Sequence, residues 1–104
     1  MAEGGCSTLE PYALRVLGDS MEPEFADGCV IIVDPGHAPR DGSYVVVEFA
    51  GDVFFRQLVF DGERRFLRPC NPKYGSFELT PPYAIRGGVV QRSGGRRAQR
   101  KHYE

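Results

Sequence analysis

Ser20 is the residue of this sequence whose type and setting best fit nucleophilic chemistry. It follows Gly18 and Asp19, where an alternating apolar segment (residues 12–17) gives way to a short turn. A hydroxyl group there can cap the turn by accepting a backbone hydrogen bond. The same position places it beside unpaired N–H groups that could stabilise an oxyanion. The second role requires a base, because a serine hydroxyl is not nucleophilic at neutral pH.

The sequence offers few bases for such a serine. His37 lies in the loop-forming segment 34–42 and His102 in the C-terminal tail, and neither has an obvious carboxylate to orient it. The acidic residues around Ser20 fit the start of a turn better than a paired-carboxylate site, which needs two acids from separate strands. These acidic residues are Asp19, Glu22, Glu24 and Asp27. The spacing of Asp19 and Glu22 resembles a capping box and predicts a short helical turn.

The cysteines predict neither a metal site nor a disulfide framework. Cys6, Cys29 and Cys70 are widely spaced and form no C-x-x-C pair. Three unpaired thiols fit a reducing cytoplasm. We therefore expect no metal, no cofactor and a cytoplasmic location.

Short strands must position Ser20 and any partner. Runs of apolar and β-branched residues alternate with turn signals, and no stretch has room for a βαβ unit. The turn Ala50-Gly51-Asp52 and the pair Asp61-Gly62 predict hairpins, and Gly87 next to Gly88 predicts a bulge or a close backbone approach. The expected strands are residues 12–17, 29–33, 43–49, 53–60, 64–68, 76–79 and 83–92. This pattern predicts an all-β fold of short antiparallel strands.

Length and charge indicate one domain with two flanking segments. The 104 residues suffice for a single modest core. We expect an N-terminal arm (1–11), the domain (12–92) and a disordered tail (93–104) with four basic side chains and one acidic one. The acidic body offers no basic stripe for nucleic acid. The longest apolar run, residues 29–33, is too short to span a membrane.

Several segments in order resemble the LexA-like serine peptidase family, which includes LexA-type repressors, UmuD-like proteins and phage repressors, with signal peptidases as distant relatives. The resemblance covers residues 12–92. Its motifs are the segment GDSMEP (18–23), the strand DVFFRQL (52–58) and the loop NPKY (71–74). It implies a compact, barrel-like all-β fold with one short helical turn. It also implies a cytoplasmic regulator of transcription, as in the SOS response.

The resemblance further implies a serine–lysine dyad that cleaves the protein's own upstream segment. Ser20 takes the nucleophile position, with Gly18, Asp19 and Met21 supporting it, and the lysine position is occupied by Arg56. A lysine beside the apolar residues of this strand would lose its proton near neutral pH, whereas an arginine keeps its charge. We therefore expect a serine hydrolase whose proteolysis is impaired. The arginine is either natural to a non-cleaving member or was introduced to stop cleavage.

The resemblance leaves two rival interpretations open. The chain could be an active peptidase that uses another base, such as Lys73 or Lys101, or a small β-barrel interaction domain in which Ser20 is only a cap. Only 19 residues precede Ser20 and contain no Ala-Gly or Cys-Gly scissile pair. We therefore expect a truncated or processed domain, or a short stand-alone member, with DNA binding left to a separate domain absent here. The family also implies a homodimer, which we expect to form through residues 83–92 as an exposed edge.

Overall fold

The computed structural model describes residues 10–94 and 99–102, and this part of the chain folds as one antiparallel sheet of eight strands. It includes no helix, so the predicted all-β class is confirmed. The strands are β1 (Tyr12–Arg15), β2 (Val30–Asp34), β3 (Tyr44–Phe49), β4 (Asp52–Asp61), β5 (Arg64–Arg68), β6 (Phe77–Leu79), β7 (Tyr83–Gly94) and β8 (Gln99–His102). The described residues contain no helix with the length and apolar character that crossing a membrane requires.

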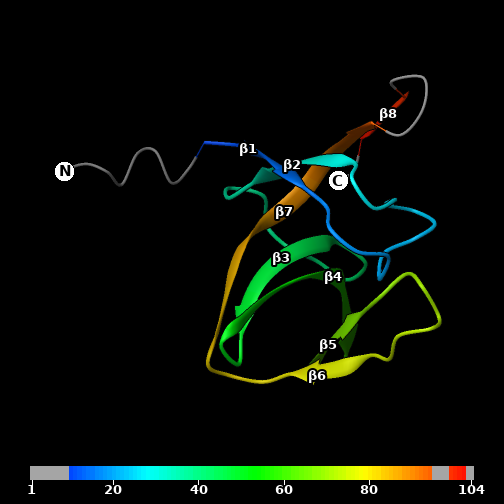
Figure 1. Ribbon diagram of the computed structural model, residues 1–104. Helices are drawn as coiled ribbons and strands as arrows, with labels where there is room; N and C mark the ends of the chain where they lie inside the picture. Colours follow the sequence, from blue (N-terminus) through cyan, green and yellow to red (C-terminus); the bar gives the residue numbers. More distant parts are fainter. Residues whose placement is uncertain (1–9, 95–98, 103–104) are drawn as a thin grey trace.

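Strand β7 joins the two ends of the molecule. The strands are ordered β1-β2-β7-β3-β4-β5-β6, and β8 pairs with β7 off this path. Figure 1 shows β7 running from β3–β6 at one end to β1, β2 and β8 at the other. Its first half pairs with β3 and its second half with β2 and β8. The strand that follows Ser20's turn, β2, is thereby fixed to the hairpin β3–β4, which carries Arg56.

Both predicted hairpins form. Ala50 and Gly51 connect β3 to β4 with φ values of 55° and 84°, the left-handed conformations that a tight hairpin between right-twisted strands requires. Gly62 has a φ of 63° in the two-residue connection from β4 to β5, where Asp61 pairs with Arg64. The register of β4, and so the placement of Arg56 opposite Val45, follows from the first of these turns.

The glycine pair in β7 marks a close backbone approach, as predicted. A Cβ atom on Gly87 would lie 2.7 Å from Cγ1 of Val33 and 2.9 Å from the carbonyl oxygen of Asp34. A Cβ atom on Gly88 would collide with the ring of His37. The register between β7 and β3 also shifts beside this pair, as in a bulge. Neither glycine leaves room for a side chain.

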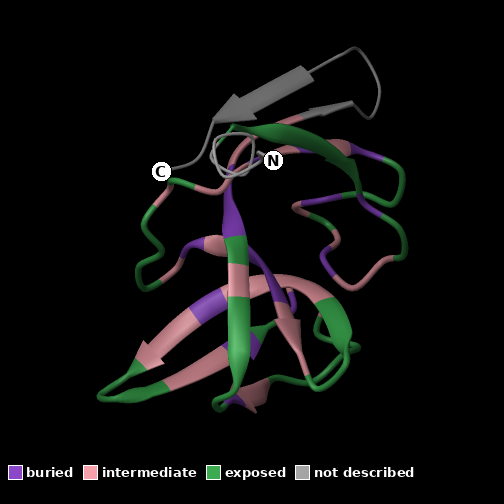
Figure 2. Cartoon of the chain, turned by 90° about the vertical axis from the view of Figure 1, so that its left-hand side faces the viewer, coloured by how far each residue is buried: buried purple, intermediate pink, exposed green. Residues whose placement is uncertain are grey.

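The core is divided into two clusters by β3, whose side chains are buried on both faces. Val46 belongs to the first cluster, and Val45 and Val47 to the second. The other buried members of the first cluster are Val16, Met21, Phe25, Cys29, Ile31, Val33 and Val89. Those of the second are Leu58, Leu67 and Leu79. Figure 2 shows the buried centre of β7 and the more exposed residues at its start.

The expected helical turn after Gly18 is present only as a single closed turn. The N–H of Phe25 donates to the carbonyl oxygen of Met21 at 2.8 Å, and no helix continues from it. Pro23 lacks the N–H that a longer ladder would use. The expected capping box does not form, because the carboxylate of Glu22 accepts instead from the N–H of Asp27 at 3.2 Å.

Two further expectations need correction. The tail is not disordered throughout, because Gln99–His102 forms β8 against the end of β7; a ladder of backbone hydrogen bonds does not require apolar side chains. Residues 95–98 and 103–104, and most of the expected N-terminal arm, lie outside the described residues. Strand β7 is not an edge strand as a whole, because it lies between β2 and β3. At its start, in the described residues, Tyr83, Ala84 and Ile85 pair with β3 and with no second strand.

Candidate active site

A glycine turn places Ser20 just after β1. Gly18 has a φ of 94°, which strongly favours glycine, and its N–H donates to the carboxylate of Asp27 at 2.8 Å. This hydrogen bond closes the loop between β1 and β2. Ser20 therefore lies at the start of a short loop whose two ends are held together.

The turn that carries Ser20 is anchored in the first core cluster. Met21 is 1% exposed and Phe25 is fully buried. The ring of Phe25 meets those of Tyr44 and Phe55 edge-on, with centroids 4.8 Å and 4.9 Å away. Such edge-to-face contacts are favourable beyond the area that they bury. Met21, which the resemblance marked as a supporting residue, thus fixes the backbone next to Ser20.

The loop after β5 holds the same segment from the other side. The backbone N–H of Asn71 donates to the carbonyl oxygen of Ser20 at 3.0 Å. Its side-chain amide donates to the carbonyl oxygen of Asp19 at 2.9 Å. Its amide oxygen in turn accepts from the N–H of Lys73 at 2.9 Å, which shapes the loop itself. Asn71 therefore fixes the carbonyl groups of two consecutive residues, Asp19 and Ser20.

Asp19 ties the turn to the same loop through its carboxylate. The hydroxyl of Tyr74 donates to one oxygen at 2.5 Å, and the ammonium group of Lys73 lies 3.2 Å from the other. The hydrogen bonds from Tyr74 and Lys73 lower the pKa of Asp19 from its ordinary value. The same pairing raises the pKa of Lys73, so this lysine holds its proton more firmly than usual. Lys73 is therefore a poor candidate for a general base.

Arg56 lies on β4 and reaches Ser20. One terminal nitrogen, Nη1, donates to Oγ of Ser20 at 3.1 Å and to the carbonyl oxygen of Phe55 at 2.9 Å. The guanidinium carbon lies 5.6 Å from the centroid of the Phe54 ring. Burial lowers the pKa of Arg56 from its ordinary value, although arginine keeps its charge in proteins. The structure thus brings together Ser20 and Arg56, which lie 36 positions apart in the sequence at the two dyad positions that the resemblance implies.

The pair Ser20 and Arg56 opens onto a cavity of about 310 Å³. Its walls are largely aliphatic and aromatic, and they include Leu14 of β1, Ile31 of β2 and Val46 of β3. A cavity of this size is at the lower end of those that bind small ligands or a side chain. The serine hydroxyl is therefore positioned beside a small apolar space.

His37 does not join this pair. Its ring packs against Gly88 of β7, and it is absent from the lining of the cavity beside Ser20. Its Nε2 atom is buried without a hydrogen-bond partner. The side chains of His102 and Lys101 lie outside the described part of the structure. In that part, no group of three or more metal-ligating side chains gathers to hold a metal ion.

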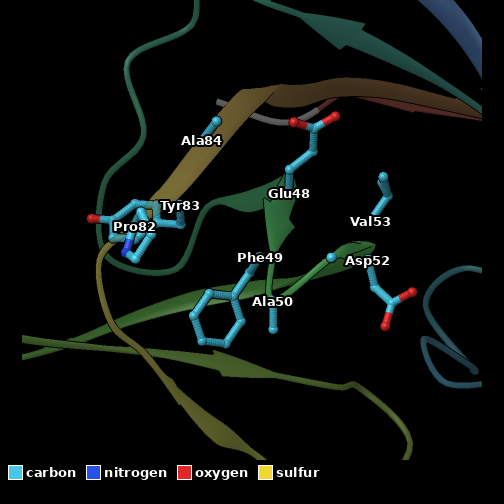
Figure 3. A pocket seen from close by; sticks show the side chains of 9 residues that line it. Glu48, Phe49, Ala50, Asp52, Val53, Pro82, Tyr83 and Ala84 are labelled. Carbon is cyan, nitrogen blue, oxygen red and sulfur yellow. The ribbon is translucent and has the colours of Figure 1, made fainter.

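A second, larger cavity lies at the hairpin between β3 and β4. It measures about 630 Å³ and is lined partly by the carboxylates of Glu48 and Asp52. In Figure 3 the rings of Phe49 and Tyr83 lie on one side of Ala50 and the carboxylate of Asp52 on the other. Neither Ser20 nor Arg56 lines this space. It is therefore separate from the serine pair.

The sequence left the role of the loop 71–74 unassigned. Its motif contributed to the resemblance, but Asn71 and Tyr74 were not expected to hold the nucleophile segment. An asparagine before a proline does predict a turn. No local signal indicates that this turn contacts residues more than 50 positions away.

The sequence matches the family model described as Peptidase S24-like over residues 7–90. It is 39% identical over 97 residues to the HTH-type transcriptional regulator for conjugative element R391 of Providencia rettgeri, covering 86% of this chain and 43% of that protein. It is 38% identical over 87 residues both to Repressor protein C2 of Salmonella phage P22 and to LexA repressor 2 of Pseudomonas syringae pv. tomato, covering 78% of this chain and 40% and 43% of those proteins. The chain thus spans less than half the length of these relatives.

Proposed function

We propose, from the premise that this chain belongs to the Peptidase S24-like family, that it is the peptidase-like domain of a LexA-type transcriptional regulator. The relatives named as regulators and repressors support this role. In this proposal the substrate is the protein's own upstream segment or a peptide, and DNA contacts belong to a separate domain. A cytoplasmic location is part of the proposal, supported by the free thiols of Cys29 and Cys70.

The hydrogen bond from Nη1 of Arg56 to Oγ of Ser20, 3.1 Å long, carries the more specific part of the proposal. Ser20 occupies the nucleophile position, and Arg56 occupies the position from which a base would remove its proton. A guanidinium group is charged throughout the physiological pH range and has no lone pair to accept that proton. The proposed consequence is a family member with little or no peptidase activity.

Two observations weigh against an active enzyme with a different base. Lys73 is bound to the carboxylate of Asp19, and this pairing raises its pKa. His37 does not line the cavity in which Ser20 lies. Lys73 is therefore protonated, and His37 lies away from the cavity. Neither side chain can remove the proton of the Ser20 hydroxyl in this arrangement. The interpretation of Ser20 as a purely structural cap is disfavoured, because Ser20 lines the cavity, where a ligand could reach it.

Wild-type protein should react no faster with a fluorophosphonate serine probe at pH 7.5 than the Ser20→Ala variant does. The physical reason is that, among the residues that the structure describes, neither His37 nor Lys73 is placed to remove the proton of the Ser20 hydroxyl. Labelling is measured by mass spectrometry of the intact chain, with an active serine peptidase as the positive control. Labelling of the wild type that Ser20→Ala abolishes would contradict the proposal.

We also propose that the domain forms a weak homodimer through the start of β7. Residues 83–85 pair with β3 and, among the described residues, with no second strand, and Tyr83 is 38% exposed. An unpaired strand edge with an exposed ring is suited to contact a second copy. Sedimentation at high micromolar concentration should therefore detect a dimer.

Ala84→Arg should remove this dimer, because it adds a charge at an exposed position of the contact. Leu17→Arg is the matched control, since Leu17 is 80% exposed and lies in the loop of Ser20. A wild-type protein that remains monomeric, or a dimer that Leu17→Arg weakens as much as Ala84→Arg, would contradict this contact.

A further inference from the structure

The cavity beside Ser20 and Arg56 combines apolar walls with positive charge. Two of its lining residues, Arg15 and Arg56, are cationic, and none of them is acidic. The charged residues that line the larger cavity at the β3–β4 hairpin are instead acidic, Glu48 and Asp52, and Glu48 pairs with Arg86. The protein as a whole carries a net charge of −1. The positive charge at the small cavity is therefore a local feature that favours an anionic ligand.

The charge of Arg56 is not compensated by a carboxylate anywhere in residues 10–94. Its hydrogen bonds reach two neutral oxygen atoms, those of the Ser20 hydroxyl and the Phe55 carbonyl. Its Nε atom is buried without a partner. Burial also lowers the pKa of this residue, which reflects the desolvation of its charge. A partly desolvated cation without an opposite charge is costly, and an anion beside it would reduce that cost.

Arg56 and Ser20 each offer a hydrogen-bond donor that is suited to a carboxylate. A guanidinium group has five N–H donors in a planar fork, and both hydrogen bonds of Arg56 start from Nη1. Nη2 therefore retains donors for an acceptor in the cavity. The Ser20 hydroxyl accepts from Arg56, which leaves its own hydrogen free to donate. Together they offer charge-assisted hydrogen bonds to one anionic group.

We propose that this cavity binds the C-terminal carboxylate of an apolar peptide. The C-terminal residue of a peptide carries its carboxylate and its side chain on the same Cα atom. It can therefore present the carboxylate to Arg56 and Ser20 while its side chain meets Leu14, Ile31 or Val46. This inference rests on the proposed function in one respect, because Ser20 must hold such a peptide without cleaving it. The arginine thus turns the position of a base into a receptor for an anion.

Two other anions serve as comparisons for the choice of ligand. Inorganic phosphate has no apolar part to occupy the cavity and would remain hydrated. A short fatty acid such as hexanoate shares the carboxylate and the apolar tail but lacks the backbone groups of a peptide. These ligands separate binding of a peptide terminus from binding of any anion.

The test is a titration of the full chain, labelled with ¹⁵N, using N-acetyl-Ala-Val-Leu with either a free carboxylate or a C-terminal amide. The acid should bind at least ~10-fold more tightly than the amide, because a charge-assisted hydrogen bond contributes about this much. Arg56→Gln should weaken binding of the acid by a similar factor. Arg64→Gln is the matched control, since it removes the same charge from an exposed arginine that pairs with Glu78.

Equal affinity for acid and amide would overturn the inference on the wild-type protein alone, whether or not Arg56→Gln folds. If Arg64→Gln weakened binding of the peptide acid as much as Arg56→Gln does, the net charge of the protein rather than Arg56 would account for the binding, and the inference would be wrong. Binding of hexanoate or phosphate as tight as that of the peptide acid would overturn the choice of ligand. All of these outcomes leave the proposed lack of peptidase activity untouched, because that activity is measured separately with the serine probe.

Discussion

Arg56→Lys should give this protein a serine peptidase activity well above that of the wild type. The substitution replaces the guanidinium group, whose Nη1 lies 3.1 Å from Oγ of Ser20, with a primary amine. A neutral lysine can take the proton of Ser20 while Oγ attacks a peptide carbonyl, whereas the arginine cannot. General-base catalysis typically contributes about 10²–10⁴-fold to the rate. The gain is measured with a peptide that contains the Ala-Gly bond implied by the family resemblance.

The pH dependence of the lysine variant tests the same mechanism. Burial lowers the pKa of Arg56, and the same surroundings should lower the pKa of a lysine there. Only the neutral amine accepts a proton, so activity should be low in acid and rise as the pH passes through the pKa of the lysine.

Two variants serve as controls for this gain. Ser20→Ala combined with Arg56→Lys should be inactive, and Arg64→Lys should gain nothing, because Arg64 is exposed and bound to Glu78. No gain in folded Arg56→Lys, or a gain that persists without Ser20, would exclude Arg56 as the position of the missing base.

Phe25→Ala should be among the most destabilising single substitutions in the domain. Phe25 is fully buried, and its ring contacts those of Tyr44 and Phe55. Truncating a buried phenylalanine to alanine typically costs about 3–5 kcal/mol, a large part of the total stability of a small domain. The thermal midpoint should fall by at least ~10 °C, measured by circular dichroism.

Leu17→Ala is the matched control for this loss. Leu17 lies in the same loop but is 80% exposed, so removing its side chain should have little effect. Phe25→Leu should give a smaller loss and keep the comparison possible if the alanine variant does not fold. A loss for Phe25→Ala no larger than that for Leu17→Ala would mean that the turn of Ser20 is not anchored in the core.

The strands and hairpins could be predicted from the sequence because their signals are local. Gly51 and Gly62 supply the left-handed backbone of two hairpins, and alternating apolar residues mark the strands between them. The Gly87-Gly88 pair likewise indicated a close approach that the structure confirms. Each of these signals depends on a few neighbouring residues, so it can be interpreted without knowing the rest of the fold.

Arg56 was identified by the resemblance rather than by any local rule, and the local setting of Ser20 did not decide between a nucleophile and a cap. A serine after a turn is equally suited to capping, and an arginine on an alternating strand is equally suited to the surface. Only the register of β3 and β4 and the anchoring of the Ser20 turn bring the two side chains within hydrogen-bonding distance. Their roles in chemistry stay predictions.

The remaining features were decided only by the tertiary structure. Asn71 binds the backbone on both sides of Ser20, and Lys73 pairs with Asp19 and so is held protonated. These contacts join loops more than 50 residues apart, and loops carry no periodicity from which such a pairing could be predicted. The position of β7 between β2 and β3, and the pairing of β8 with its end, have the same origin. Strand order depends on which long-range backbone hydrogen bonds form, and every strand offers the same N–H and carbonyl groups.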